Sequence, residues 1–575
     1  MPNRPEFLRQ PATRSRPAQR ERQLAAGLCG LLLTACGLLF LVPPRVTAQE
    51  ASSSSLGEVA RELRQKKQAE VRLRPEDVTA LFASLDQILD FASKDTGFAK
   101  HGPVKRQVVG REYVEAYYAW KFPKQAEEGL ARSELVLKKI GLLAPDFDLK
   151  NYLVRATVPQ LEGFYNFRDK TMYLLNWVPL ERQGPIMAHE LTHALQDQNY
   201  DLLRFMQSAP RAPAKAGNPG SMAVRGTDEE EEHSLASRAL VEGQAMVVFL
   251  DYVLRPTGHT LAASPDALSL LSGALENYES TVALHDAPRV LRESATFPYR
   301  EGLAFELELL RRGGRPMAFA DAFARTPTNT YQILHPDAYL AKSATPSVSI
   351  PDIRPILGDG FELFDSGTIG ALDTRIMVRE YGRENDRYTV AAQWYGGSYV
   401  AVKPTGVATQ KLTPADISLF YVSRWKTAQA AERFAYLYKT ALSKREPDAR
   451  EQTVDNTRCV QTAPCGDPRW ISRLVTKEGL AYLEVLPNNM TIVAQGFSDA
   501  TVAQLRALVL SLELSHPGQN RARVGHLTSA PASRELGLSL YESPAFLAFQ
   551  KSVLDSVLSS QFPVLSTEFS PHRSR

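Results

Sequence analysis

The stretch Gly184-Pro-Ile-Met-Ala-His-Glu-Leu-Thr-His-Ala-Leu-Gln-Asp197 decides how the rest of the chain is interpreted. Pro185 suits the first turn of a helix, because that turn has spare N–H groups and proline lacks one. No helix breaker follows before Gln198, and apolar residues recur at helical spacing at Met187, Leu191, Ala194 and Leu195. We therefore predict an amphipathic helix that begins near Pro185.

Three residues of this helix, His189, Glu190 and His193, stand in the order H-E-x-x-H. Side chains four residues apart project from one helix face, so the two imidazoles could hold one Zn²⁺ ion. Glu190 could then take a proton from a water molecule that the metal activates. The alternative is an ordinary helix that carries two polar surface histidines.

A second helix offers a third metal ligand. The acidic run Asp228–Glu232 favours a helix start, and a stripe at helical spacing follows at Leu235, Ala239, Glu242, Met246 and Phe249. A buried carboxylate is costly unless it is paired or metal-bound, which makes Glu242 our predicted ligand, while Gly243 permits close helix approach. The alternatives are a Glu242 paired with Arg238, or His233 as the ligand. The extended motif with a third histidine is excluded, since Gln196 and Asn199 occupy the required positions.

Further residues are candidates for supporting roles. Asp197 could accept the outer N–H of a ligand histidine, or could be an exposed acid near the helix end. Hydrolysis at a metal centre also needs a donor to the oxyanion. Tyr299 and His335 are the two candidates for that donor, although a histidine before a proline could equally be a packed loop residue.

The composition is that of a globular protein. The chain has 575 residues, of which 44% are hydrophobic and 23% charged, so we expect two or three domains rather than disorder. The net charge is +3, but residues 1–48 hold seven arginines and two acids, which leaves −2 for the remainder. Nothing in this charge balance predicts nucleic-acid binding.

The N-terminal segment resembles a secretory leader. An arginine-rich start precedes the apolar run Leu24–Val42, and small residues follow, which predicts signal-peptide cleavage after Ala48. The two alternatives are a lipid anchor at Cys36 and an uncleaved membrane anchor. All three place the body of the protein outside the cytoplasm, where Cys459 and Cys465 are expected to form a disulfide.

The pattern between residues 57 and 345 is mainly helical. Helices are predicted over 57–92, 107–120, 133–143 and within 265–325, and a strand over 152–158. A hairpin is predicted over 163–175 with its turn near Arg168–Lys170, and its edge strand could hold an extended peptide. Residues 49–56 are interpreted as a linker, and the Pro/Gly/Ala-rich residues 208–228 as a mobile insertion.

The sequence pattern changes after a second predicted linker at 346–369. Residues 370–515 predict an α+β domain with helices packed on an antiparallel sheet. Its predicted strands are 374–380, 388–404, 417–425, 470–476 and 480–497, and its predicted helices are 427–442 and 499–512. Residues 516–575 are interpreted as a partly helical C-terminal tail.

Several of these motifs together are similar to a known group. His189–Gln198 and Ala239–Ala245 resemble the gluzincin zinc metallopeptidases, and more closely secreted bacterial proteins of that group. The segments that support the closer resemblance are Gly163–Tyr165, Phe297–Gly302 and Ile333–Pro336. The resemblance implies an α+β protein whose residues 57–345 form a mainly helical, zincin-like domain with a small antiparallel sheet. It also implies zinc at His189, His193 and Glu242, with Glu190 as general base.

The sequence therefore predicts a secreted or envelope-attached zinc metallopeptidase acting on peptide or protein substrates. Membrane attachment, if present, would come through the N-terminal leader alone. The alternative is a non-catalytic envelope protein that keeps zinc and uses residues 370–515 to bind a partner.

Overall fold

The structure is a computed structural model that describes residues 73–515, apart from 115, 117–123, 158–162, 208–227, 264–286, 346, 349 and 453–469. Residues from Val71 onward group into one compact unit, to which all the described residues belong. Several predicted features lie outside the described residues: the leader and the linker (1–56), the insertion, the Cys459–Cys465 disulfide, and the tail (516–575). None of the helices in the described part is long and apolar enough to cross a membrane.

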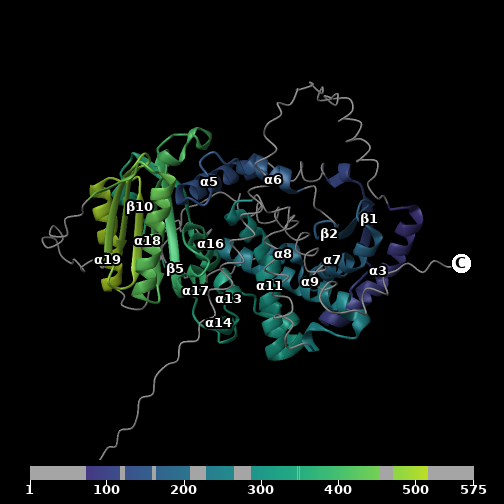
Figure 1. Ribbon diagram of the computed structural model, residues 1–575. Helices are drawn as coiled ribbons and strands as arrows, with labels where there is room; N and C mark the ends of the chain where they lie inside the picture. Colours follow the sequence, from purple (N-terminus) through teal and green to yellow (C-terminus); the bar gives the residue numbers. More distant parts are fainter. Residues whose placement is uncertain are drawn as a thin grey trace, which may run out of the picture. The chain divides into compact units, whose positions relative to one another are not determined.

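The first part of the unit is built on long helices (Figure 1). α9 (Asp228–Leu254) packs between α7 (Leu180–Tyr200) and α11 (Arg289–Pro316), and α3 (Pro75–Thr96) packs on α7. The other helices here are α5 (Lys124–Ile140), α6 (Leu149–Thr157), α8 (Leu202–Gln207), η2 (Arg255–Thr257), η3 (Leu261–Ala263), η5 (Met317–Asp321), α12 (Ala322–Ala324), α13 (Thr330–Leu334) and α14 (Pro336–Leu340). α11 is interrupted near the Gly313-Gly314 pair, because Gly314 has non-helical backbone angles.

A three-stranded sheet lies beside these helices, in the order β1-β3-β2. The predicted hairpin is confirmed, since β2 (Gly163–Asn166) pairs antiparallel with β3 (Thr171–Leu175). The sheet is mixed rather than purely antiparallel, because β1 (Lys105–Val109) joins β3 in parallel. The prediction of a helix over 107–120 is therefore wrong at its start, where residues 107–109 are strand and helix begins only at Arg111.

Two further local predictions need correction. Residues 152–158 were expected to be a strand, but α6 covers Leu149–Thr157. Asp148 accepts a hydrogen bond from the Asn151 N–H at 2.9 Å, and such an N-cap stabilises a helix against the β preference of this segment. The helix with the H-E-x-x-H motif begins at Leu180 after Pro179, and Pro185 lies inside it.

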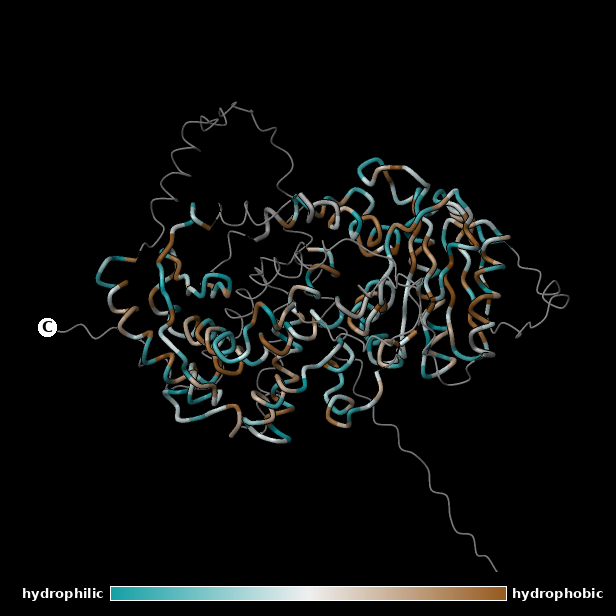
Figure 2. The backbone as a smooth tube through the Cα atoms, turned by 180° about the vertical axis from the view of Figure 1, so that it is seen from behind, coloured by the Kyte–Doolittle hydropathy of each residue, from teal (hydrophilic) through white to brown (hydrophobic). Residues whose placement is uncertain are grey.

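The second part of the unit holds a seven-stranded antiparallel sheet in the order β4-β5-β6-β10-β9-β8-β7. Helices cover both of its faces. In β6, Leu419 and Tyr421 belong to the core that includes Phe434 of α18, whereas Phe420 belongs to the cluster that includes Leu505 of α19. This alternation is what a strand buried on both sides requires, and Figure 2 shows hydrophobic residues along these strands.

The strands are β4 (Phe361–Thr368), β5 (Trp394–Pro404), β6 (Ser418–Trp425), β7 (Arg450–Gln452), β8 (Trp470–Thr476), β9 (Gly479–Val485) and β10 (Met490–Gln495). The helices are α15 (Arg354–Leu357), α16 (Ala371–Tyr381), α17 (Asp386–Thr389), η6 (Ala391–Gln393), η7 (Thr409–Lys411), η8 (Pro414–Asp416), α18 (Ala428–Arg445) and α19 (Asp499–Ser515). An α+β architecture is thus present.

The predicted strands at 417–425 and 470–476 and both predicted helices are confirmed, and 480–497 contains β9 and β10. Three assignments differ. Residues 374–380 belong to helix α16 rather than a strand, and the Asp373 carboxylate accepts the Gly370 N–H at 3.0 Å at its start. Strand β5 begins at Trp394, after α17, rather than at residue 388. The segment 346–369, expected as a linker, contains strand β4 of the sheet.

Candidate metal centre

Two packed helices supply the candidate metal ligands. α7 carries His189, Glu190 and His193, and α9 carries Glu242. The two histidines lie four residues apart on one face of α7, and that face is turned toward α9. The four residues are 1–4% exposed. Burial of this kind is unfavourable for a carboxylate unless a cation or strong hydrogen bonds compensate it.

The ligand atoms converge on one point. His189 Nε2 and His193 Nε2 are 3.0 Å apart, and Glu242 Oε2 lies 3.2 Å from the first and 3.4 Å from the second. A tetrahedral ion with bonds of about 2.0–2.1 Å would space its ligand atoms roughly 3.3 Å apart. The spacing of the group therefore fits a single metal ion. Among the described residues, it is the one cluster of histidines and acids whose ligand atoms lie close enough together to hold an ion.

The electrostatics of the group are those of a buried site with mixed charge. Burial lowers the pKa of His189 to about 4. Burial would also lower the pKa of His193, but the Glu242 carboxylate outweighs it and raises that pKa to about 9. Burial would raise the pKa of Glu242, whereas His193 and His189 lower it to about 2. The centre thus keeps Glu242 ionised, which is the state in which a carboxylate binds a metal ion.

The side chains of Gln196 and Gln244 form a chain of hydrogen bonds that begins at His193. His193 Nδ1 lies 2.8 Å from Gln196 Oε1, and Gln196 Nε2 donates to Val241 O and to Gln244 Oε1, each at 3.0 Å. Gln244 Nε2 donates in turn to Ala318 O at 2.8 Å. Such a contact fixes the ring orientation and the tautomer of a ligand histidine. This role of Gln196 was not predicted from the sequence, although its position three residues after His193 was a usable signal.

Asp197 has neither of the two roles considered for it, because it is buried and its described partners are not ligand histidines. Its Oδ2 accepts from Tyr165 OH at 2.8 Å and from Lys170 Nζ at 2.9 Å, and its Oδ1 accepts from the Leu202 N–H at 3.0 Å. None of its partners among the described residues is a ligand histidine. Asp197 instead ties the β2–β3 hairpin and the start of α8 to the helix that carries the ligands.

Glu190 is held by the edge strand β2. The Tyr165 N–H donates to Glu190 Oε2 at 2.8 Å. This hydrogen bond orients the carboxylate beside the first ligand. It also occupies one main-chain donor of the strand that was expected to hold an extended peptide.

The two alternatives for the third ligand are not realised in the described part of the chain. The ion pairs of Glu242 are with the two histidines, and Arg238 is not among its partners. His233 Nε2 lies 3.4 Å from Ser237 Oγ on α9, and the metal-binding group does not include His233. Glu242 is therefore the third member of the cluster, as predicted.

Close helix packing positions Glu242 and places Tyr299 one turn from this crossing. A Cβ atom on Gly302 would lie 2.1 Å from Ala239 O, and one on Gly243 would lie 2.4 Å from Gly302 O. α11 therefore crosses α9 beside Glu242, which confirms the expected role of Gly243. Tyr299 is 1% exposed and precedes Gly302 by one helical turn.

His335 is placed elsewhere. It lies between α13 and α14 and lines a pocket of about 610 Å³ together with residues of α11, α16 and α17. None of the four residues of the metal centre lines that pocket. The structure therefore does not bring His335 together with the predicted ligands.

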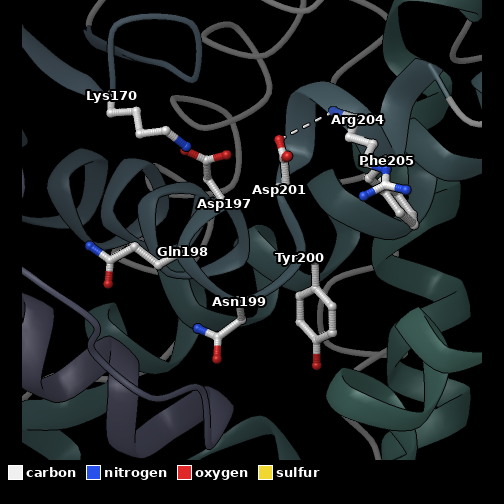
Figure 3. Close-up of a pocket in the computed structure, with 8 residues that line it drawn as sticks. All are labelled: Lys170, Asp197, Gln198, Asn199, Tyr200, Asp201, Arg204 and Phe205. Carbon is white, nitrogen blue, oxygen red and sulfur yellow. Dashed lines mark hydrogen bonds and ion pairs between the residues drawn. The ribbon is translucent and has the colours of Figure 1, made fainter.

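A second pocket, of about 650 Å³, lies past the ligands at the C-terminal end of α7 (Figure 3). It is lined by Lys170, Asp197, Gln198, Asn199, Tyr200, Asp201, Arg204 and Phe205. In Figure 3 the Lys170 side chain points toward Asp197, and the Arg204 N–H donates to Asp201. No metal-centre residue lines this pocket either.

No family model, curated protein or solved structure matches the chain. The function is therefore inferred from the geometry of the metal centre and from the quoted motifs.

Proposed function

We propose that this chain is a zincin-like zinc metallopeptidase with the gluzincin ligand set His189, His193 and Glu242. The observation that carries the proposal is the convergence of their three ligand atoms, 3.0–3.4 Å apart, next to Glu190. Two histidines and one glutamate leave a fourth position of a tetrahedral ion open, as catalytic rather than structural zinc sites do. Bound zinc would lower the pKa of a water molecule and polarise the scissile carbonyl.

Glu190 is the residue that moves the proton. Its carboxylate takes a proton from the attacking water and delivers it to the leaving amine. The Tyr165 N–H holds Glu190 Oε2 at 2.8 Å, which keeps the carboxylate oriented for both transfers. Tyr299 is the proposed donor to the oxyanion, since α11 places it one turn from the crossing beside Glu242. Export through the N-terminal leader is part of the proposal, and the mature chain would begin at Gln49.

The first experiment is Glu190→Gln in the purified protein. Glutamine keeps the side-chain shape and can still accept the Tyr165 N–H, but it cannot take a proton. We expect about 10²–10⁴-fold loss of peptide hydrolysis with an unchanged zinc content by elemental analysis. Glu308→Gln on α11 is the matched control and should keep wild-type activity, because within the described part of the chain Glu308 pairs with Arg311 and Arg312 alone.

The near-complete burial of the ligands favours a second candidate, in which zinc serves folding and residues 370–515 bind a partner. A broad peptide library separates the two. Wild-type protein that holds one zinc per chain and cleaves no member of the library would support the second candidate and overturn the first. If zinc is catalytic, its removal should abolish activity while the protein stays folded. If zinc is structural, its removal should unfold the protein.

A further inference from the structure

Two of the sequence motifs meet at a pocket away from the metal centre. Phe297–Gly302 contributes Arg300 and Glu301, and Ile333–Pro336 contributes Leu334 and His335. The other walls come from α16, which packs against α11 (Figure 1), and from the segment that holds α17 and η6. The metal centre gives these motif residues no role, so the pocket needs its own explanation.

The charged lining of this pocket is dominated by guanidinium groups. Arg300, Arg375, Arg379 and Arg387 line it, against two acids, Glu301 and Glu384, which gives the lining a net charge of +2. The buried Glu293 lies behind this wall, where it pairs with Arg379 at 2.8 Å. On the other side, Lys426 and Arg375 add positive charge around His335.

The ion pairs do not use all of the N–H donors of the pocket's arginines. Glu301 Oε1 is shared by Arg300 at 2.9 Å and Arg375 at 2.8 Å, and Glu384 is shared by Arg379 at 3.0 Å and Arg387 at 2.8 Å. Each acid thus serves two guanidinium groups. Among the described residues, Arg375 Nη2 and Arg387 Nε are buried and have no hydrogen-bond partner, and the buried Arg375 Nε has only the Glu293 carboxylate, 4.0 Å away. Unsatisfied buried donors are unfavourable, and an oxyanion is the acceptor that arginine binds best.

We infer that this pocket is a binding site for the oxyanion of a small acidic ligand, either a carboxylate or a phosphate. Arginines from three segments converge on it, and a pocket of about 610 Å³ is large enough for a small molecule. The site is separate from zinc binding, because no metal-centre residue lines it. α11 connects the two sites, because it crosses α9 beside Glu242 at Gly302 and carries Arg300 and Glu301 of the pocket.

The test titrates the purified full-length chain with inorganic phosphate and, separately, with succinate, at constant ionic strength and with calorimetric detection. We expect saturable binding of one of the two probes, and the identity of that probe distinguishes a phosphate from a carboxylate ligand. Arg300→Gln and Arg387→Gln should each weaken binding about tenfold or more, because each removes a charged donor.

Two further variants separate binding from folding. Glu384→Gln removes a competing negative charge from a side chain that is 53% exposed, and should tighten binding. Arg354→Gln is the matched control, because Arg354 is exposed, pairs with Asp352 and lies outside the pocket, so binding should equal that of wild type. The inference is overturned if neither probe saturates, or if the pocket variants bind like the Arg354 control.

Discussion

At the scale of single residues, Gln196 links the metal ligands to the body of the protein. Its Oε1 faces His193 Nδ1, and its Nε2 reaches α9 at Val241 and Gln244. We predict that Gln196→Ala lowers zinc affinity about 10–100-fold, because the His193 ring loses its orienting partner. Competition with a chromogenic chelator measures this affinity directly.

The matched control is Gln198→Ala, two positions along the same helix. Gln198 accepts the His101 N–H and donates to Gly102 O, and neither contact involves the metal centre. Its loss should leave zinc affinity unchanged. Equal zinc affinities for the two variants would show that Gln196 does not orient the His193 ligand.

The oxyanion donor is a second question at this scale. Tyr299→Phe keeps the ring that fills the buried position on α11 and removes only the hydroxyl. If Tyr299 donates to the oxyanion, kcat should fall about 10²–10³-fold while zinc binding persists. His335→Ala should leave kcat within about twofold of wild type in the same peptide assay, since His335 lines the arginine-lined pocket and not the metal centre. The opposite pattern would make His335 the donor.

These residues show how far the sequence alone could lead. His189, Glu190 and His193 follow from spacing along one helix, and Glu242 follows from an acid in an apolar stripe on another. The roles of Asp197 and His335 depend on distances between segments far apart in the chain. Asp197 turns toward Tyr165 and Lys170, which no local pattern records.

At the scale of elements, the crossing of α9 and α11 determines where Glu242 sits. We predict that Gly243→Ala destabilises the protein by about 1–3 kcal/mol, because the new Cβ would lie 2.4 Å from backbone atoms of Gly302. This exceeds the gain of about 1 kcal/mol that alanine brings to a helix. Urea unfolding measures the change, and the zinc affinity of the variant should fall with it.

Gly184→Ala is the control for this substitution. Gly184 also lies within a helix, but the nearest atoms to an added Cβ belong to the Tyr252 ring, at 3.2 Å. A side-chain ring can shift where a backbone cannot, so the stability of this variant should stay within about 1 kcal/mol of wild type. Destabilisation of both variants to the same degree would mean that the crossing has no special role.

The elements predicted wrongly share a physical cause. Residues 152–157 and 374–380 are rich in β-formers, yet both lie in helices with an aspartate that accepts a backbone N–H at their start. Conversely, residues 107–109 were predicted to be helical but form a strand, because β3 offers a parallel partner about 66 residues later in the chain. Caps and long-range pairing outweigh the intrinsic preference of a segment.

At the scale of the whole molecule, Glu232 stands where the helical part meets the sheet-bearing part. Its Oε2 accepts from the Thr330 N–H at 2.9 Å and from the Thr330 hydroxyl at 2.8 Å. A Cβ on Gly370, the residue before α16, would lie 2.1 Å from its Oε1. Burial, and then the nearby Asp373, raise the pKa of Glu232 to about 7.

This raised pKa makes stability depend on pH. Between about pH 4.5 and 7 the folded protein keeps a proton on Glu232 that the unfolded chain releases, so the stabilisation is complete at low pH and lost as pH rises. Glu232→Gln mimics the protonated acid and should remove this dependence. The variant should match wild type near pH 4.5 and exceed its unfolding free energy at pH 7 by up to about 3 kcal/mol.

Urea unfolding across this pH range tests the prediction at constant ionic strength. Asp95, whose pKa burial and Asp251 also raise to about 7, adds the same slope to wild type and variant alike. The difference between the two curves therefore reports on Glu232 together with the neighbouring Asp373, whose pKa burial also raises. Glu432→Gln on the exposed face of α18 controls for the change in net charge and should follow wild type. A difference in unfolding free energy, variant minus wild type, that stays constant with pH would contradict the prediction. A difference that falls as pH rises would show that Glu232 is ionised in the folded protein throughout. The junction between the two parts would then be held by the Thr330 hydrogen bonds to a carboxylate, and acid would loosen it instead of tightening it.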